Sequence, residues 1–134
     1  MDTDYTENEK EKPTISILSN HQTLLNSLSG WLYHRYPGCN LNTSSKDITR
    51  LPYLDNNHKN LVIIDFGLSF SADLNIINTL NFKYPGMNII AIIPFKKEVL
   101  SADLKDINNL KLIPKWEITA ILPRLINSIL GTKK

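Results

Sequence analysis

The sequence predicts an α/β fold in which five parallel strands form one sheet with helices on both faces. Short apolar runs rich in β-branched residues alternate with longer segments that repeat apolar residues at helical spacing. The run at 61–65, Leu-Val-Ile-Ile-Asp, is apolar up to its last residue, which is typical of a central strand covered on both faces. Strands that alternate with helices indicate βαβ units and therefore a parallel sheet.

Each expected strand is bounded by residues that favour turns or loops. Ser19-Asn20 follows the first strand, Pro37-Gly38 precedes the second, and Pro94 ends the fourth. The last strand, at 110–113, is expected to be more exposed than the buried strands before it. The expected strands are 14–18, 39–43, 61–65, 89–93 and 110–113.

Five helices are expected between and after these strands. Ser69 or Ser71 can cap the third helix through a side-chain oxygen. Pro123 lies inside the last helix, and we expect it to kink or break that helix because it removes one backbone hydrogen bond. The expected helical stretches are 24–35, 45–54 as a weaker helix or loop, 69–82, 99–107 and 116–130.

The length of the chain favours one domain. At 134 residues it is too short for two ordinary domains. Residues 1–13 lack apolar periodicity and are expected to form a flexible tail, whereas residues 14–134 are expected to form the folded domain. A content of 42% hydrophobic and 21% charged residues is that of an ordinary globular protein.

Charge and cysteine content argue against several classes of function. The net charge is +2, and no aromatic and basic stripe of the kind that binds nucleic acid is present, so we expect no direct DNA binding. Cys39 is the single cysteine, which excludes an internal disulfide and a multi-thiolate zinc site and fits a reducing cytoplasm. No run approaches the roughly 18 apolar residues of a membrane span, so we expect a cytoplasmic protein without membrane contact.

Asp65 ends the third of five expected strands, and this placement resembles the receiver domain of two-component response regulators. The resemblance covers residues 14–130, and it implies a flavodoxin-like (βα)5 doubly wound sheet. Tyr-Pro-Gly-Met-Asn-Ile-Ile at 84–90 is similar to the segment that leads into strand four of receivers attached to LuxR-type DNA-binding domains. The resemblance implies that Asp65 occupies the phosphoacceptor position, at the edge of the sheet where open α/β folds bind ligands.

Other positions depart from the receiver pattern. Receivers hold a magnesium ion with two acidic residues after strand one, and here these positions are Ser19 and Asn20. The switch hydroxyl at the end of strand four becomes Ile93, or Pro94 if the register slips by one residue. The strand-five lysine aligns with Ile113, and Ile113-Pro114 falls where the family has its lysine and cis-proline.

Lys111 and Lys115 lie close enough to the strand-five position to restore a cation if the register differs. The resemblance thus implies a pseudo-receiver without catalytic residues, metal or cofactor. Magnesium would be needed only if Asp65 is phosphorylated after all.

The segments 17–20, 62–66 and 109–131 are similar to the LuxR-type regulators of biofilm matrix. Some of these proteins bind cyclic di-GMP through a Trp-x-Thr/Ser-Arg motif, which this sequence lacks. The resemblance implies control of transcription as a homodimer, through a LuxR-type DNA-binding domain in cis or through a partner regulator. The helix pair formed by the first and last helices is one candidate interface, and the fourth helix with the last strand and helix is another.

Three functions therefore remain open. The first is a regulatory module that is not an enzyme and acts by dimerisation or partner contacts. The second is a phosphorylatable receiver that uses Asp65. The third is a sensor of a cyclic dinucleotide or other small ligand in the crevice above Asp65, near Ser19, Asn20 and the loop 66–67.

Two tryptophans have different expected roles. Trp116 follows the last strand and is either an exposed interface residue or packed against Pro114 and the last helix. Trp31 lies on the apolar side of the first helix, and we expect it in the core.

Overall fold

The computed structural model describes residues 13–46, 60–67, 71–96, 104, 107 and 109–131. The expected tail up to residue 12, residues 47–54 of the weaker helix or loop, and most of the stretch 99–107 lie outside these residues. The division into a tail at 1–13 and a domain at 14–134 therefore stays a prediction.

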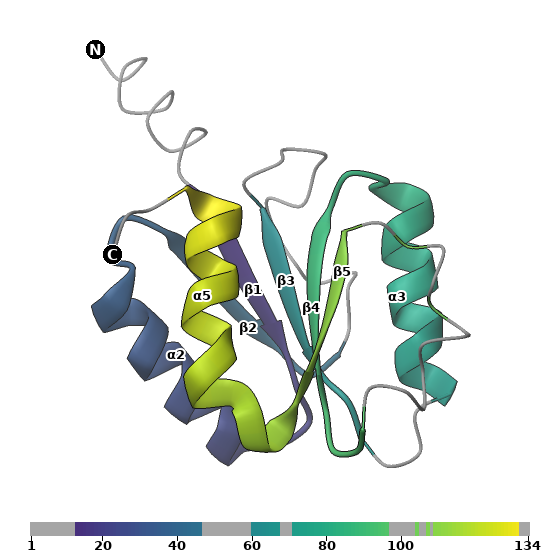
Figure 1. The fold of residues 1–134 in the computed structure, drawn as a ribbon, viewed down its shortest axis with the longest axis horizontal. Helices are drawn as coiled ribbons and strands as arrows, with labels where there is room; N and C mark the ends of the chain where they lie inside the picture. The colour runs from purple at the N-terminus through teal and green to yellow at the C-terminus, as the bar shows by residue number, and fades with distance from the viewer. Residues whose placement is uncertain are drawn as a thin grey trace.

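A five-stranded parallel sheet forms the centre of the fold (Figure 1). The first strand, β1, is an inner strand of the sheet. The second strand lies on one side of β1, and the third, fourth and fifth strands follow in order on its other side, so the topological switch point lies between β1 and β3. Every strand pair is parallel, which confirms the predicted doubly wound α/β fold. In sheet order the strands are β2 (Asn40–Ser44), β1 (Thr14–Leu18), β3 (Leu61–Asp65), β4 (Asn88–Ile93) and β5 (Leu110–Pro114).

Three α-helices among the described residues cover the sheet: α2 (Gln22–Arg35), α3 (Ser71–Lys83) and α5 (Ile118–Leu130). The helices α2 and α5 lie on one face and α3 lies on the other (Figure 1). The Tyr36 hydroxyl donates a hydrogen bond to Asn127 Oδ1 at 2.8 Å, which joins the end of α2 to α5. None of the described helices combines the length and the apolar character that crossing a membrane requires.

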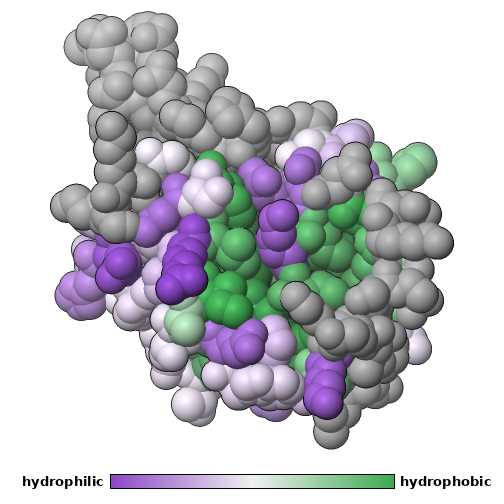
Figure 2. Space-filling view, viewed as in Figure 1, coloured by the Kyte–Doolittle hydropathy of each residue, from purple (hydrophilic) through white to green (hydrophobic). Residues whose placement is uncertain are grey.

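The central strands face two separate hydrophobic cores, because successive side chains of a strand point to opposite faces of the sheet. Ile63 packs in the core shared with α2 and α5, whereas Ile64 packs in the core shared with α3. Both side chains are fully buried. This double coverage explains why the run that forms β3 is apolar without alternation. On the surface, apolar side chains gather between α5 and α3, and hydrophilic side chains cover the α2 side (Figure 2).

The last helical segment differs from the prediction at two points. It starts as a 3-10 turn, η2 (Lys115–Glu117), before α5 begins at Ile118. The helix α5 then continues through Pro123 without a break. A proline cannot donate the backbone bond to the fourth residue before it. The fully buried Leu122 and Ile126 offset this loss, because a helix in a protein is stabilised mainly by the packing of its apolar face.

Candidate functional site

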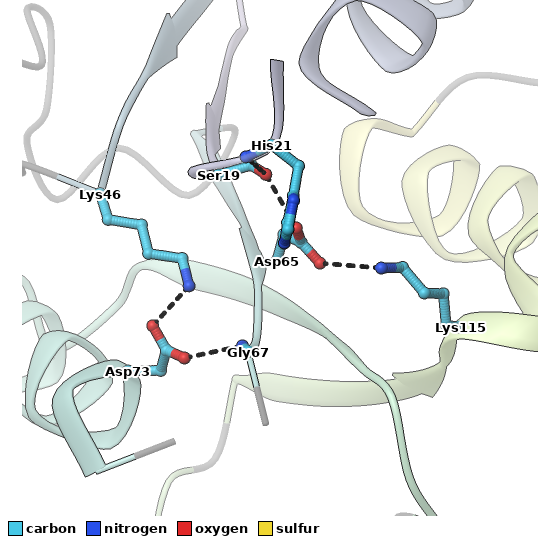
Figure 3. Close-up of polar contacts among 7 residues, drawn as sticks. All are labelled: Ser19, His21, Lys46, Asp65, Gly67, Asp73 and Lys115. Atoms are coloured by element: carbon cyan, nitrogen blue, oxygen red, sulfur yellow. Dashed lines mark hydrogen bonds and ion pairs between the residues drawn. The ribbon is translucent and has the colours of Figure 1, made fainter. Parts of the chain in front are cut away.

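Asp65 is a buried carboxylate at the C-terminal end of β3. Its side chain is hydrogen-bonded to Ser19, the residue that follows β1. The residue Asp65 is 1% exposed. Ser19, also fully buried, donates a hydrogen bond from Oγ to Asp65 Oδ2 at 2.8 Å (Figure 3). Ser19 Oγ accepts the backbone N–H of His21 at 3.0 Å. The hydroxyl group has one proton, so this second contact leaves that proton for Asp65.

The other oxygen of Asp65 faces a cation. Lys115 Nζ lies 3.7 Å from Asp65 Oδ1, on the side of the carboxylate away from Ser19 (Figure 3). A hydrogen bond from an ammonium group would span about 2.7–3.2 Å, and Oδ1 has no hydrogen-bond partner. Ser19 and Lys115 therefore hold Asp65 unequally, one by a short hydrogen bond and the other by a longer electrostatic contact.

The remaining positions named from the receiver pattern do not supply chemical groups to Asp65. Ile113 is fully buried in the core with α2 and α5, so the cation beside Asp65 comes from Lys115, two residues later. Ile93 is fully buried at the end of β4 and has no hydroxyl group. The peptide bonds of the described residues are all trans, including the bond before Pro114.

A polar hollow opens beside Ser19, at the C-terminal ends of β1 and β2. Its volume is about 310 Å³. Asn20, which is exposed, lines the hollow together with Ser19, and neither brings a charge. The other lining residues are Gln22, Leu25, Thr43, Ser44 and Ser45.

A second ion pair lies at the same edge of the sheet, and sequence reasoning missed it. Lys46 Nζ lies 2.8 Å from Asp73 Oδ1, and the backbone N–H of Gly67 donates to Asp73 Oδ2 at 3.0 Å (Figure 3). Asp73 is buried in the first turn of α3, where a carboxylate complements the helix dipole. Asp73 therefore fixes the backbone two residues after Asp65. The position of Asp73 in the first turn of a predicted helix was the signal in the sequence that could have pointed to this ion pair. Its partner Lys46 could not be placed, because it belonged to a stretch without clear periodicity.

These side chains do not fit a divalent cation. Magnesium prefers octahedral oxygen coordination that includes one or two carboxylates. Asp65 is bonded to Ser19 on one oxygen, and a metal ion at the other would meet the positive charge of Lys115. Within the part of the chain that the structure describes, no group of three or more His, Cys, Asp or Glu side chains could hold a metal ion.

Cys39 is the free cysteine expected from the sequence, and it is partly buried. Burial raises the pKa of its thiol above the usual value. The thiolate is the nucleophilic form of cysteine, so at neutral pH this thiol is a poor nucleophile.

Comparison with known proteins gives a match at the level of the fold. No protein-family model matches the chain, and no curated protein matches its sequence significantly. Among solved structures, the chain is similar to the RcsB response regulator of Salmonella typhimurium, with a TM-score of 0.66 and 16% sequence identity. The match covers 92% of this chain and 71% of that chain.

The fold is that of a response-regulator receiver domain. The RcsB structure was described for conformational dynamism in DNA interaction. At 16% identity the likeness establishes the fold, whereas the chemistry depends on the side chains of this chain.

Proposed function

We propose that this chain is a pseudo-receiver: a non-catalytic, cytoplasmic module of a bacterial response regulator that controls transcription through dimerisation or partner contacts. The observation that carries this proposal is the pairing of Asp65 with Ser19 and Lys115 in place of acidic metal ligands. The receiver fold supports the wider assignment to signal transduction.

The side chains around Asp65 are poorly suited to phosphoryl transfer. That reaction depends on positive charge, usually from magnesium, that neutralises the oxygens of the transferred group. Lys115 is the cation beside Asp65, and its side chain is 44% exposed, so water weakens its field. Ser19 directs its proton to Asp65, and Ile93 offers no hydroxyl to a phosphoryl oxygen.

Mass spectrometry of the purified protein after incubation with acetyl phosphate, with and without magnesium, tests the pseudo-receiver proposal. We expect the mass of the wild type to stay unchanged under both conditions. Asp65→Asn is the matched control, because it keeps the shape of the side chain and removes the nucleophilic carboxylate. A phosphoryl adduct on the wild type that is absent from Asp65→Asn would contradict the proposal.

The second candidate is a phosphorylatable receiver, and Oδ1 of Asp65, which accepts no hydrogen bond, favours it. In this reaction Oδ1 would attack the phosphorus of acetyl phosphate, the bond from phosphorus to the acetyl oxygen would break, and acetate would leave. Lys115 would then offset charge on the phosphoryl group. If an adduct forms, Lys115→Met should abolish it, whereas Lys111→Met, on an exposed lysine of β5, should not.

The third candidate is a small-ligand sensor, and the polar hollow beside Ser19 favours it. A volume of about 310 Å³ lies at the lower end of the range for ligand pockets, roughly 300–1,000 Å³. A small polar ligand therefore fits better than a complete cyclic dinucleotide. Calorimetric titration with cyclic di-GMP tests the cyclic-dinucleotide form of this candidate. The size of the hollow predicts no binding, and binding that Asn20→Ala weakens would overturn that expectation.

The partners that we propose are a second copy of the chain and a LuxR-type DNA-binding domain or partner regulator. Trp116 is 62% exposed, which favours its reading as an interface residue. A second surface lies between α2 and α5, where a hollow of about 220 Å³ includes Trp31. Trp31 is partly buried at the edge of the core, and the guanidinium of Arg35 lies 5.8 Å from the centre of its ring.

Sedimentation velocity can distinguish the two surfaces. Two-fold dimers are the commonest soluble oligomers, so we expect a dimer of the wild type. Thr119→Glu places a charge in the α2–α5 hollow at an exposed position, and Trp116→Ala removes the exposed ring. The variant that shifts the protein to monomer identifies the interface. A wild type that is monomeric at all concentrations would contradict dimerisation.

A further inference from the structure

The α2–α5 hollow is a small and mainly apolar depression between the two helices that cover one face of the sheet (Figure 1). Its volume is about 220 Å³. The buried side chains of Leu28 and Leu122 line it, together with the partly buried Ile118. The hollow shares no lining residue with the polar hollow beside Ser19. An apolar lining favours a ligand with an apolar part, because binding removes both surfaces from water.

The ring of Trp31 forms a wall of this hollow and is held in place from the protein side. It makes a T-shaped contact with the ring of Tyr36, with 6.2 Å between the ring centres and an interplanar angle of 79°. Tyr36 is buried, and its hydroxyl is hydrogen-bonded to Asn127 of α5. A ring that is already held in position offers a contact surface with little loss of side-chain entropy on binding.

Arg35 brings a positive charge to the hollow. The side chain lines the hollow, and its guanidinium carbon lies 5.8 Å from the centre of the Trp31 ring. Among the described residues, the ion pairs are those of Asp65 and Asp73 with lysines, and Arg35 has no acidic partner. A guanidinium group can bind a carboxylate through two parallel hydrogen bonds. The charge of Arg35 is therefore available to an anionic ligand.

Two residues of α5, Thr119 and Pro123, complete the lining. Pro123 has no backbone N–H for the carbonyl of Thr119, four residues earlier, and a proline inside a helix lowers the stability of that helix. Its ring instead adds apolar surface to the hollow. A residue that is unfavourable for its own element is expected most often at a functional site.

We propose that the α2–α5 hollow binds a small organic carboxylate with an apolar body. The carboxylate pairs with Arg35, and the apolar body packs on Trp31 between the two helices. The volume lies below the range of roughly 300–1,000 Å³ for ligand pockets, so a body of one aromatic ring is the expected size. The charge of Arg35 disfavours a neutral ligand, and the apolar lining disfavours an inorganic anion. This site goes beyond the proposed regulatory function and does not involve Asp65.

Nuclear magnetic resonance titration of the full chain with phenylacetate tests the site. The chain has two tryptophans, and Trp31→Phe assigns their indole N–H signals. We expect phenylacetate to shift the signal of Trp31 and to leave that of Trp116 in place. Phenylacetamide keeps the ring without the charge, and acetate keeps the charge without the ring. Each should bind about tenfold more weakly than phenylacetate, because a charge-assisted pair and the apolar contact both contribute.

Arg35→Gln and Arg124→Gln form a matched pair of variants. Each removes one exposed arginine from a helix, and Arg35 lines the hollow whereas Arg124 does not. We expect Arg35→Gln to weaken phenylacetate binding about tenfold and to leave phenylacetamide binding unchanged. Arg124→Gln should bind phenylacetate as the wild type does. Far-ultraviolet circular dichroism checks that both variants are folded.

The carboxylate site is overturned if phenylacetate leaves the Trp31 signal in place, if phenylacetamide binds equally well, or if both arginine variants weaken binding equally. A second copy of the chain is the alternative occupant of the hollow. A wild-type dimer that Thr119→Glu converts to monomer, together with no phenylacetate binding, would assign the hollow to that interface and overturn the ligand site. A phosphoryl adduct on Asp65 would contradict the pseudo-receiver and leave the carboxylate site intact, so the two proposals fail separately.

Discussion

At the scale of single residues, the central feature is a buried carboxylate with one hydrogen bond from a neutral donor and one longer contact with a cation. A charge that is buried without partners is strongly unfavourable, so Asp65 needs both Ser19 and Lys115. A hydroxyl at position 19 supplies a hydrogen bond without adding a second negative charge. The pocket therefore needs no metal ion to balance repulsion between carboxylates.

We expect Ser19→Ala to destabilise the fold by about 1–3 kcal/mol, because it leaves Asp65 Oδ2 buried without a donor. Urea denaturation followed by circular dichroism measures the free energy of unfolding. Ser45→Ala is the matched control, since Ser45 lines the same hollow but is exposed. Equal stability of the two variants would show that the Ser19 bond contributes nothing.

The sequence pointed to part of this site. Asp65 and Ser19 could be placed because Asp65 ends one recognisable strand and Ser19 directly follows another, and the ends of parallel strands meet at one edge. The alignment with the receiver pattern put the lysine position at Ile113, with Lys111 or Lys115 as the cation if the register differed. Strand alternation directs Ile113 into the core, and Lys115 reaches Asp65 from the turn beyond β5. Such a reach depends on the path of the turn, which residue patterns do not describe.

At the scale of elements, the pair formed by Lys46 and Asp73 joins the end of β2 to the start of α3. Lys46 has a backbone φ of 51°, in the left-handed region that is unfavourable for a residue with a side chain. The ion pair and the bond from Gly67 to Asp73 compensate for this conformation. The backbone of Gly67, two residues after Asp65, is thereby held by a side chain of α3.

We expect Lys46→Met to destabilise the fold by about 3 kcal/mol, because it leaves the buried carboxylate of Asp73 without its cation. Thermal unfolding or urea denaturation measures the change. Lys83→Met, on an exposed lysine at the end of α3, is the control for loss of one positive charge. In an Asp73→Asn background the effect of Lys46→Met should nearly vanish. An undiminished effect in that background would rule out the pair as its cause.

We expect Pro123→Ala to stabilise the fold by about 1–2 kcal/mol. Alanine restores a backbone donor inside α5, and this gain is reduced because Pro123 lines the α2–α5 hollow and its ring contacts are lost. Arg124→Ala, on the exposed neighbouring residue, controls for helix propensity alone. A lower urea midpoint for Pro123→Ala than for the wild type would show that ring packing dominates.

The elements themselves were predictable to different degrees. The apolar run that became β3 matched its expected bounds, because both faces of that strand are buried and leave no ambiguity. The second strand was displaced by one residue, to Asn40–Ser44, because its residues are only partly buried. Of the kink or break expected at Pro123, the break did not occur, since tertiary packing outweighed a local preference.

At the scale of the whole molecule, the fold class followed from the alternation of strands and helices, whereas the function depends on a few contacts at one edge. Five short strands that alternate with helical segments permit few other topologies once crossovers are right-handed. The same topology hosts many chemistries, so it does not determine whether the edge binds metal or phosphate.

We expect magnesium to leave the thermal stability of the protein unchanged. A ligand that binds only the folded state raises the melting temperature in proportion to the logarithm of its concentration above Kd. Among the described residues no group of three or more His, Cys, Asp or Glu side chains could hold a metal ion, and Lys115 faces Asp65, so we expect magnesium chloride to act no differently from sodium chloride of equal ionic strength. A rise in melting temperature with magnesium alone, absent from Asp65→Asn, would reveal a site at Asp65.

The hydrogen bond between Tyr36 and Asn127 has a consequence for the order in which the molecule can fold. The core on the α2 and α5 face combines Ile15, near the start of the chain, with Leu130, near its end. During synthesis on the ribosome this face stays uncovered until the last helix emerges. Contacts between residues so far apart in sequence also slow folding. We therefore expect the incomplete chain to be prone to aggregation through that face until α5 has emerged.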